Sequence, residues 1–192
     1  MNITPHSLTE KVGLGGRKYW VEEGADLKPS RLDDEAYKVA IATLPIIGID
    51  ILLYNREKNA AYLALRTLRP MSGAWWFIGG RVRFGQTEEE AAKSIFKRET
   101  GQDLDVTRVK FFDTYRTFWK DRDASPTDVG SDTTALVFGI EVTMEEVEAI
   151  GKGLDPQEYA EGKGLRAFPL EEILEPGKFE IFVQRAAQHF LG

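Results

Sequence analysis

The stretch GGRVRFGQTEEEAAKSIFKRETGQDL, residues 79–104, decides the expected fold, because it joins a glycine turn to a capped helix. Thr87 and Glu90 have the spacing of a capping box, in which each side chain accepts a hydrogen bond from the other residue's backbone N–H. Apolar residues then recur on one helical face: Ala91, Ala92, Ile95 and Phe96. Gly101 is placed to end this helix, and Glu99 continues the edge of its buried stripe.

Outward from this segment, the hydrophobic pattern alternates between helical and extended periods. It predicts helices over about 32–43, 87–100 and 179–190, and strands over about 46–53, 61–65, 75–78, 109–119 and 134–142, with a polar loop at 120–133. The first two strands form an expected hairpin. This order predicts an α/β (α+β) fold, a mixed β-sheet sandwiched between helices. We expect residues 1–29 to form an N-terminal arm and residues 30–192 to form a single domain.

Length and composition limit the possible chemistry. The chain has 192 residues, of which 42% are hydrophobic and 29% charged, which is typical of one globular domain. The absence of cysteine excludes disulfides, thiolate metal sites and a cysteine nucleophile. His6 and His189 are the two histidines and lie near the chain ends, so a histidine-centred triad or metal cluster is not expected, and we interpret both as bystanders.

Charge and hydropathy limit the partners. A net charge of −6 and a pI near 5.1 argue against binding nucleic acid, which needs a basic surface. No apolar run is long enough to span a membrane. The first residues lack the pattern of a secretory signal, so we expect a cytoplasmic protein.

The segment 79–104 resembles a Nudix box, a pattern of glycines and glutamates that binds a metal and a diphosphate. It keeps the glycine at 80, the final acid at 99 and the closing glycine at 101. Other box positions depart from the pattern: Gln86, Ser94, Ile95, Arg98 and Gln102. The box is therefore degenerate.

One branch of the Nudix superfamily, the GDP-mannose hydrolases, has a similarly reduced box, and the chain resembles this branch over roughly residues 32–143. PIIGID (45–50) is similar to its first strand, LRTLRP (65–70) to a strand end with an arginine, and GAWWFIGGRV (73–82) to its turn into the box. The resemblance implies a magnesium-dependent hydrolase of a nucleoside diphosphate sugar.

The resemblance also implies roles for single residues. The carbonyl of Gly79 and the carboxylate of Glu99 would ligate Mg²⁺, Arg81 would grip the diphosphate, Arg66 would stabilise the leaving diphosphate, and Asp50 would contact the nucleotide. Mg²⁺ is commonly held by one or two carboxylates plus substrate phosphates, so a single glutamate can suffice. Arginine offers a planar fork that matches phosphate oxygens.

Two roles stay open. The branch has a second phosphate-gripping arginine where this chain has Ser94; Lys93, Lys97 and Arg83 are the candidate substitutes. The branch also has a Gln-His pair on a later loop, as metal ligand and general base. The comparable DPQEYAEGKG (155–164) offers Gln157 as a ligand and Glu158 or Glu161 as a base.

Structural interpretations compete with these roles. A helix acid can simply be solvated, and arginines can form surface salt bridges of little energetic weight. An aspartate within an apolar strand, by contrast, needs a partner or a ligand. We interpret the aromatic run 75–77 as core and pocket wall, and the acidic loop with aspartates at 121, 123, 128 and 132 as a solvated lid.

Three functional hypotheses follow. The first is Mg²⁺-dependent hydrolysis of a nucleoside diphosphate sugar, such as GDP-mannose, with water attacking the anomeric carbon. The second is a pyrophosphatase in which water attacks phosphorus. The third is a catalytically silent module that binds a related small nucleotide. A homodimer is expected in each case, because the helix at about 32–43 resembles one used for pairing in that branch.

Overall fold

The computed structural model describes residues 8–25, 27–28, 31–127 and 129–192. The prediction for His6 and part of the predicted arm lie outside these residues. The strands are β1 (Leu8–Val12), β2 (Lys18–Glu22), β3 (Ile46–Asn55), β4 (Ala60–Leu65), β5 (Trp75–Trp76), β6 (Ile78–Arg81), β7 (Lys110–Trp119), β8 (Ser131–Glu141) and β9 (Leu165–Pro169). The helices are α1 (Asp34–Thr43), α2 (Glu88–Thr100), α3 (Met144–Lys152), α4 (Leu170–Ile173) and α5 (Ile181–Leu191), with short 3-10 turns η1 (Leu14–Gly16) and η2 (Val106–Arg108).

A mixed sheet forms the centre of the described chain. Its main order is β5-β4-β3-β8-β7, β6 also pairs with β3, and β9 pairs with β4. The β3–β8 pair is parallel, whereas the other pairs are antiparallel. The expected mixed sheet and the β3–β4 hairpin are therefore confirmed.

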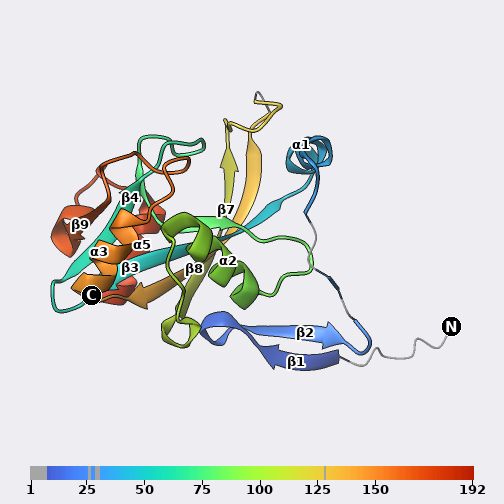
Figure 1. Ribbon diagram of the computed structural model, residues 1–192, viewed down its shortest axis with the longest axis horizontal. Helices are drawn as coiled ribbons and strands as arrows, with labels where there is room; N and C mark the ends of the chain where they lie inside the picture. Colours follow the sequence, from blue (N-terminus) through green and yellow to red (C-terminus); the bar gives the residue numbers. More distant parts are fainter. Residues whose placement is uncertain (1–7, 26, 29–30, 128) are drawn as a thin grey trace.

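Side chains of β3 alternate between two cores, as the period of a strand requires. Ile49 and Ile51 pack into a core with α2 and α3, whereas Leu52 and Tyr54 pack into a core with α4 and α5. The sheet thus has helices on both faces, and Figure 1 shows α2 lying across one of them.

The segment that decided the fold behaves locally as expected. Thr87 and Glu90 form the capping box, and Gly101 caps the helix C-terminus with a left-handed backbone at φ 69°. Pro45 follows the end of α1, whose last helical residue is Thr43.

The predicted element order was incomplete. It lacked β1, β2, β9, α3 and α4, and the loop at 120–133 is shorter than expected, because β8 already begins at Ser131. The helix predicted from residue 32 begins at Asp34, because Asp33 is its N-cap and accepts a hydrogen bond from the backbone of Ala36.

The N-terminal segment contains a hairpin of β1 and β2 that lies beside the main body (Figure 1). Arg17 anchors it: its guanidinium pairs with Glu88 at 2.8 Å and lies 5.1 Å from the ring centre of Phe111. The division into an arm and a single domain stays a prediction. None of the described helices is long and apolar enough to cross a membrane.

Candidate functional site

A cavity of about 120 Å³ opens on the α5 side of the sheet. Aromatic rings from β5, β7 and α5 form much of its wall: Trp76, Tyr115, Trp119 and Phe182. Trp76 meets Trp119 and Phe182 edge-on, with ring centres 6.4 Å apart in both pairs. Such a wall offers flat apolar surfaces to a ring-shaped ligand.

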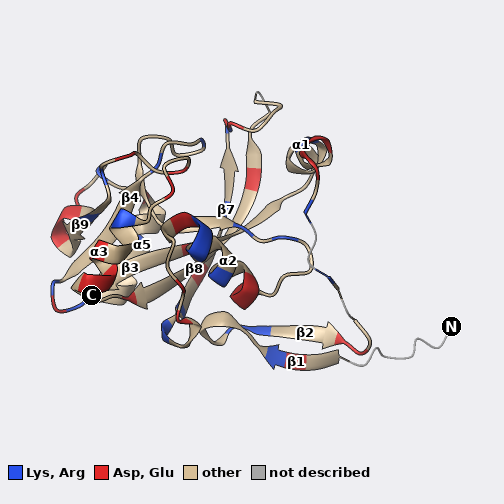
Figure 2. Ribbon diagram, in the orientation of Figure 1, with Lys and Arg blue, Asp and Glu red and all other residues tan. Residues whose placement is uncertain are grey.

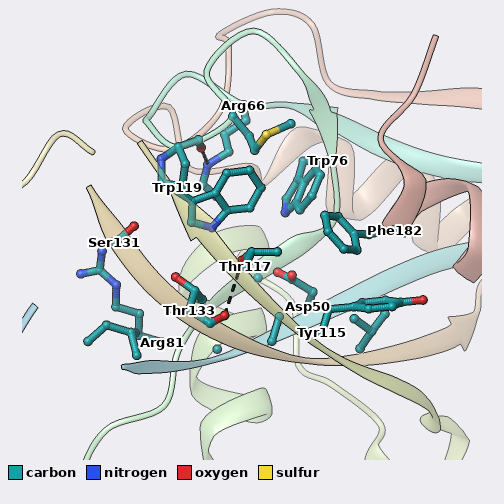
Figure 3. Close-up of a pocket in the computed structure, with 18 residues that line it drawn as sticks. Asp50, Arg66, Trp76, Arg81, Tyr115, Thr117, Trp119, Ser131, Thr133 and Phe182 are labelled. Atoms are coloured by element: carbon teal, nitrogen blue, oxygen red, sulfur yellow. Dashed lines mark hydrogen bonds between the residues drawn. The ribbon is translucent and has the colours of Figure 1, made fainter. Parts of the chain in front are cut away.

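Asp50 lies among these rings (Figure 3). It is on the same face of β3 as Leu52, so the strand directs its carboxylate toward the cavity. Loss of water around this partly buried carboxylate raises its pKa to about 6, while Arg66 and a hydrogen bond with Trp76 oppose that rise. The aspartate that stood out in an apolar strand is therefore a cavity group.

Arg66 follows β4 and also lines the cavity. Its Nε donates to the backbone carbonyls of Leu68 and Pro70, each at 3.1 Å, which fixes the guanidinium. One terminal nitrogen lies 3.8 Å from a carboxylate oxygen of Glu158. The loop that follows β4 thus presents a positioned arginine to the cavity.

Arg81 lies at the opposite end of the cavity, near Ser131 (Figure 3). Its guanidinium lies over the ring of Tyr37 in α1, 4.9 Å from the ring centre. Loss of water around its guanidinium lowers the pKa of Arg81, although much of the residue is exposed. The carboxylate of Glu158 opposes this shift, and the cations Arg122 and Arg98 lower the pKa further. Arg81 is therefore placed to gain from an anion.

Positions 79 and 80 require glycine, because other side chains lie directly against the backbone of β6 on both of its faces. A Cβ added to Gly79 would lie 2.2 Å from a carboxylate oxygen of Asp50, and one added to Gly80 would lie 2.6 Å from a terminal nitrogen of Arg98. The glycine pair lets a carboxylate and a guanidinium lie directly against opposite sides of one strand.

Glu99 lies on the α2 side of β6 and is fully buried, at 0% exposure. Its Oε1 accepts hydrogen bonds from Nε of Arg98 at 2.8 Å and from Nη2 at 2.5 Å. Its Oε2 is buried and has no hydrogen-bond partner. Burial raises the pKa of Glu99, Arg98 opposes this, and the carboxylates of Glu158 and Asp155 raise it further. A solvated helix acid is therefore the wrong description of Glu99.

The oxygen atoms around Glu99 are suitable ligands for a hard cation such as Mg²⁺. Oε2 of Glu99 lacks a partner, and other carboxylates raise the pKa of Glu99. The backbone N–H of Val82 donates to Ile47, and the alternation of an antiparallel ladder therefore turns the carbonyl of Gly79 away from β3. Within the described ranges, no three side chains of His, Cys, Asp or Glu could hold a metal together, so the backbone and the substrate would have to complete the site.

The loop at 155–161 lies against this region. The backbone N–H of Asp155 donates to the carbonyl of Glu99, and the hydroxyl of buried Tyr159 lies 3.5 Å from the carbonyl of Phe77. Glu158 is half-buried beside Arg66, whereas Gln157 and Glu161 are exposed. The loop therefore brings Glu158 closest to the other candidate residues, and the ligand role of Gln157 stays a prediction.

Two arginines were missed by the sequence analysis. Arg98 lies at a box position that looked like a loss, and its contact with Gly80 follows from the fold. Arg122 belongs to the loop read as solvated, yet it is 1% exposed and donates to the carbonyls of Ile41 and Pro126. Its Nη2 is buried without a partner.

The structure also locates the aromatic run, the acidic loop and His189. Trp76 is cavity wall and Phe77 is core, as predicted for the aromatic run. In the acidic loop, Asp123 pairs with Arg69 at 2.7 Å. Asp132 lies in β8 and pairs with Arg116 of β7, and Asp128 lies outside the described residues. His189 packs in α5 with its ring centre 4.7 Å from that of Phe112.

Comparison with known families matches the NUDIX domain to residues 44–190. The chain belongs to the Nudix family. Nudix hydrolases generally use divalent metals, and the Nudix fold binds nucleotide-like ligands. The family assignment confirms the Nudix resemblance; the GDP-mannose hydrolase branch stays a prediction.

Solved Nudix structures share the fold at low sequence identity. A MutT Nudix hydrolase from Burkholderia pseudomallei is 19% identical, with a TM-score of 0.54, covering 75% of this chain and 96% of its own. A MutT protein from Methanosarcina mazei Go1 is 22% identical, with a TM-score of 0.53 and coverages of 76% and 93%. The Nudix domain of NrtR from Shewanella oneidensis, solved with ADP-ribose, is 14% identical, with a TM-score of 0.50 and coverages of 83% and 94%.

Proposed function

We propose that this Nudix protein is a Mg²⁺-dependent hydrolase of a nucleoside diphosphate sugar of the GDP-mannose type. Water would attack the anomeric carbon, and the nucleoside diphosphate would leave. The observation that carries the proposal is the meeting of Asp50, Arg66, Gly79 and Arg81 at one aromatic cavity, with buried Glu99 across the same strand.

The cavity suits a ring attached to a diphosphate. Its aromatic rings can pack against a flat base or the C–H face of a sugar, and Asp50 can accept hydrogen bonds from N–H or O–H groups. Arg66 and Arg81 flank this space, and each guanidinium can donate two parallel hydrogen bonds to phosphate oxygens. The ring therefore belongs in the cavity and the diphosphate beside the arginines.

Glu99, the carbonyl of Gly79 and the side chain of Gln157 would hold the Mg²⁺. When bound, the ion supplies positive charge that stabilises the departing diphosphate. Glu99 supports this role because its Oε2 is buried without a protein partner.

Glu158 is our candidate for the general base. In the reaction, the water oxygen forms a bond to the anomeric carbon, the bond from that carbon to the diphosphate oxygen breaks, and Glu158 accepts the proton of the water. Its carboxylate lies 3.8 Å from Arg66, which would hold the leaving diphosphate. Glu161, the other candidate, is exposed.

Two alternatives are kept because they would leave different products. Attack at phosphorus is the reaction class of a pyrophosphatase and would give a nucleoside monophosphate. A silent binding module would give no product; the NrtR Nudix domain, solved with ADP-ribose, is a structural relative with a bound nucleotide compound.

The test is an incubation with GDP-, UDP- and ADP-sugars, ADP-ribose and dinucleotides, with and without Mg²⁺, in water enriched in ¹⁸O. Free sugar carrying ¹⁸O, together with unlabelled nucleoside diphosphate, would support the proposal. Label in a phosphate product would establish attack at phosphorus. Nucleotide binding without any product would favour the binding module.

A homodimer and a cytoplasmic location complete the proposal. Exposed apolar side chains on and near α1 support pairing: Val39, Leu44, Ile47 and Phe118. Light scattering tests it, and a monomer at micromolar concentration would contradict it.

A further inference from the structure

The site lacks the second phosphate-gripping arginine expected at position 94, where this chain has serine. The three substitutes considered from sequence do not fill the role equally. Lys93 pairs with Glu89 at 2.6 Å, and Lys97 pairs with Asp103 at 3.1 Å. Both lysines are exposed on α2, and Figure 2 shows that this helix carries basic and acidic residues together. Arg83 is exposed beyond the end of β6.

Arg98 has the placement that these residues lack. Its guanidinium packs on Gly80, a cavity-lining residue, with Nη2 2.6 Å from the position that a Cβ would take there. Its side chain is 42% exposed, whereas its partner Glu99 is fully buried. A ligand can therefore reach Arg98 without unfolding the helix.

The edge of β6 is where Arg98 and Arg81 can act on one ligand. Side chains alternate along the strand, so Arg81 leaves on the face of the cavity, whereas Arg98 approaches Gly80 from the face of α2. The hydrogen-bond ladder with β3 turns the backbone N–H and carbonyl of Arg81 toward the edge of β6 that does not pair with β3. An anion at that edge can meet guanidinium groups from both faces.

The charges at this edge favour such an anion. Arg98 and Arg122 both lie close enough to Arg81 for their positive charges to repel its own. Arg122 also has a buried terminal nitrogen without a hydrogen-bond partner. A diphosphate would convert this repulsion into attraction.

We propose that Arg98 is the second diphosphate-binding guanidinium, acting with Arg81, and that Glu99 holds it in place until the ligand arrives. Binding then exchanges one ion pair for another: Arg98 donates its hydrogen bonds to phosphate oxygens, and Oε1 of Glu99 is released. This rests on the proposed function only in taking the ligand to contain a diphosphate. The same exchange leaves both oxygens of Glu99 available to a cation.

Inorganic pyrophosphate is the probe, because it carries the diphosphate without a sugar or a base. Its affinity is measured by titration calorimetry in the presence of EDTA, for the wild type, Arg98→Gln and Glu99→Gln. We expect Arg98→Gln to weaken binding at least tenfold and Glu99→Gln to tighten it several-fold, because it frees Arg98. Lys97→Gln, a neighbouring charge change on α2, should leave the affinity within about twofold.

Arg98→Gln leaves a buried carboxylate unpaired and can unfold the protein, so a second comparison is needed. Glu99→Gln and the double variant Arg98→Gln/Glu99→Gln both lack the buried charge and differ only at Arg98. Equal pyrophosphate affinity of these two, or no binding by Glu99→Gln, would overturn the proposal. At least tenfold weaker binding by the double variant would support it.

The result is separable from the proposed function. A protein without activity on any nucleotide sugar can still bind pyrophosphate through Arg98, and an active hydrolase can bind it without this residue. Arg98→Lys adds a further distinction, because lysine keeps the charge but not the planar fork. It should restore part of the affinity lost in Arg98→Gln.

Discussion

The two faces of β6 differ in how their charged groups are satisfied. On the cavity face, Asp50 lies among aromatic rings, with Arg66 as the nearby cation that opposes the rise of its pKa. On the α2 face, Glu99 is bonded directly by Arg98 and is fully buried. The first face is ready to receive a ring, whereas the second must release an internal ion pair before it can bind. One strand thus separates a preformed subsite from one that rearranges.

The α2 face should show the largest effect on activity. Glu99→Gln keeps the size of the side chain but removes the charge that would hold Mg²⁺, so turnover should fall on the order of 10³-fold. Steady-state kinetics on the substrate found in the panel measures this. Glu89→Gln, an exposed change on the same helix, is the control. Near-normal turnover of Glu99→Gln would remove Glu99 from the mechanism.

The loop at 155–161, which contacts Glu99 on one face and Arg66 on the other, should show the second-largest effect on activity. Glu158→Gln should lower kcat by about 10²-fold or more, because a positioned general base typically contributes 10²–10⁴-fold. Glu161→Gln, on the same loop but exposed, should change kcat less than about threefold. The reverse ranking of these variants would transfer the role of base to Glu161.

Alanine substitutions at the two glycines of β6 compare how tightly each face of the strand is packed, through their effects on the free energy of unfolding. Gly79→Ala would drive a methyl group against Asp50 and against the backbone oxygen of Ile49, at 2.2 and 2.7 Å, and should cost about 1–3 kcal/mol of unfolding free energy. Gly80→Ala meets side chains alone, at 2.6 Å from Arg98 and 3.3 Å from Ile95, and should cost less, about 1 kcal/mol. Urea denaturation measures both, and a larger loss for Gly80→Ala would contradict the assignment of faces.

The cavity face should also show a pH dependence of stability. The pKa of Asp50 is about 6 in the folded protein against an ordinary value of 3.8, so the folded state holds this proton more tightly. Its contribution is therefore fully present below about pH 4 and is lost as the pH rises through 6. The change is roughly 1–3 kcal/mol, because the carboxylate is partly open to the cavity. Asp50→Asn should flatten this part of the stability profile measured by urea denaturation from pH 4 to 7; an unchanged profile would place the titration elsewhere.

Local signals explain what the sequence predicted of the fold. The helix α2 has its cap, apolar stripe and terminating glycine within one segment, so it could be placed to within a residue. The helix α3 has the same kind of capping box, at Thr143 and Glu146, and this signal could have found it. The strand β9 could not be found in this way, because its place depends on pairing with β4, about a hundred residues earlier in the chain.

The residues of the candidate site also differ in whether nearby sequence indicated their position. Asp50, Arg66, Gly79 and Arg81 line one cavity, and the roles that the resemblance implies for them stay predictions. Arg122 was missed because its burial depends on the carbonyl of Ile41, 81 residues away, and nothing within its own polar segment indicates that contact.

The two glycines of β6 also set how far the groups on its two faces lie from each other. Where a strand carries no side chains, the layer between its faces is one backbone thick, and Asp50 and Arg98 approach that backbone from opposite sides. The backbone of β6 is therefore the whole wall between the two sites, so a ligand that moves this strand from one face also changes the shape of the other face.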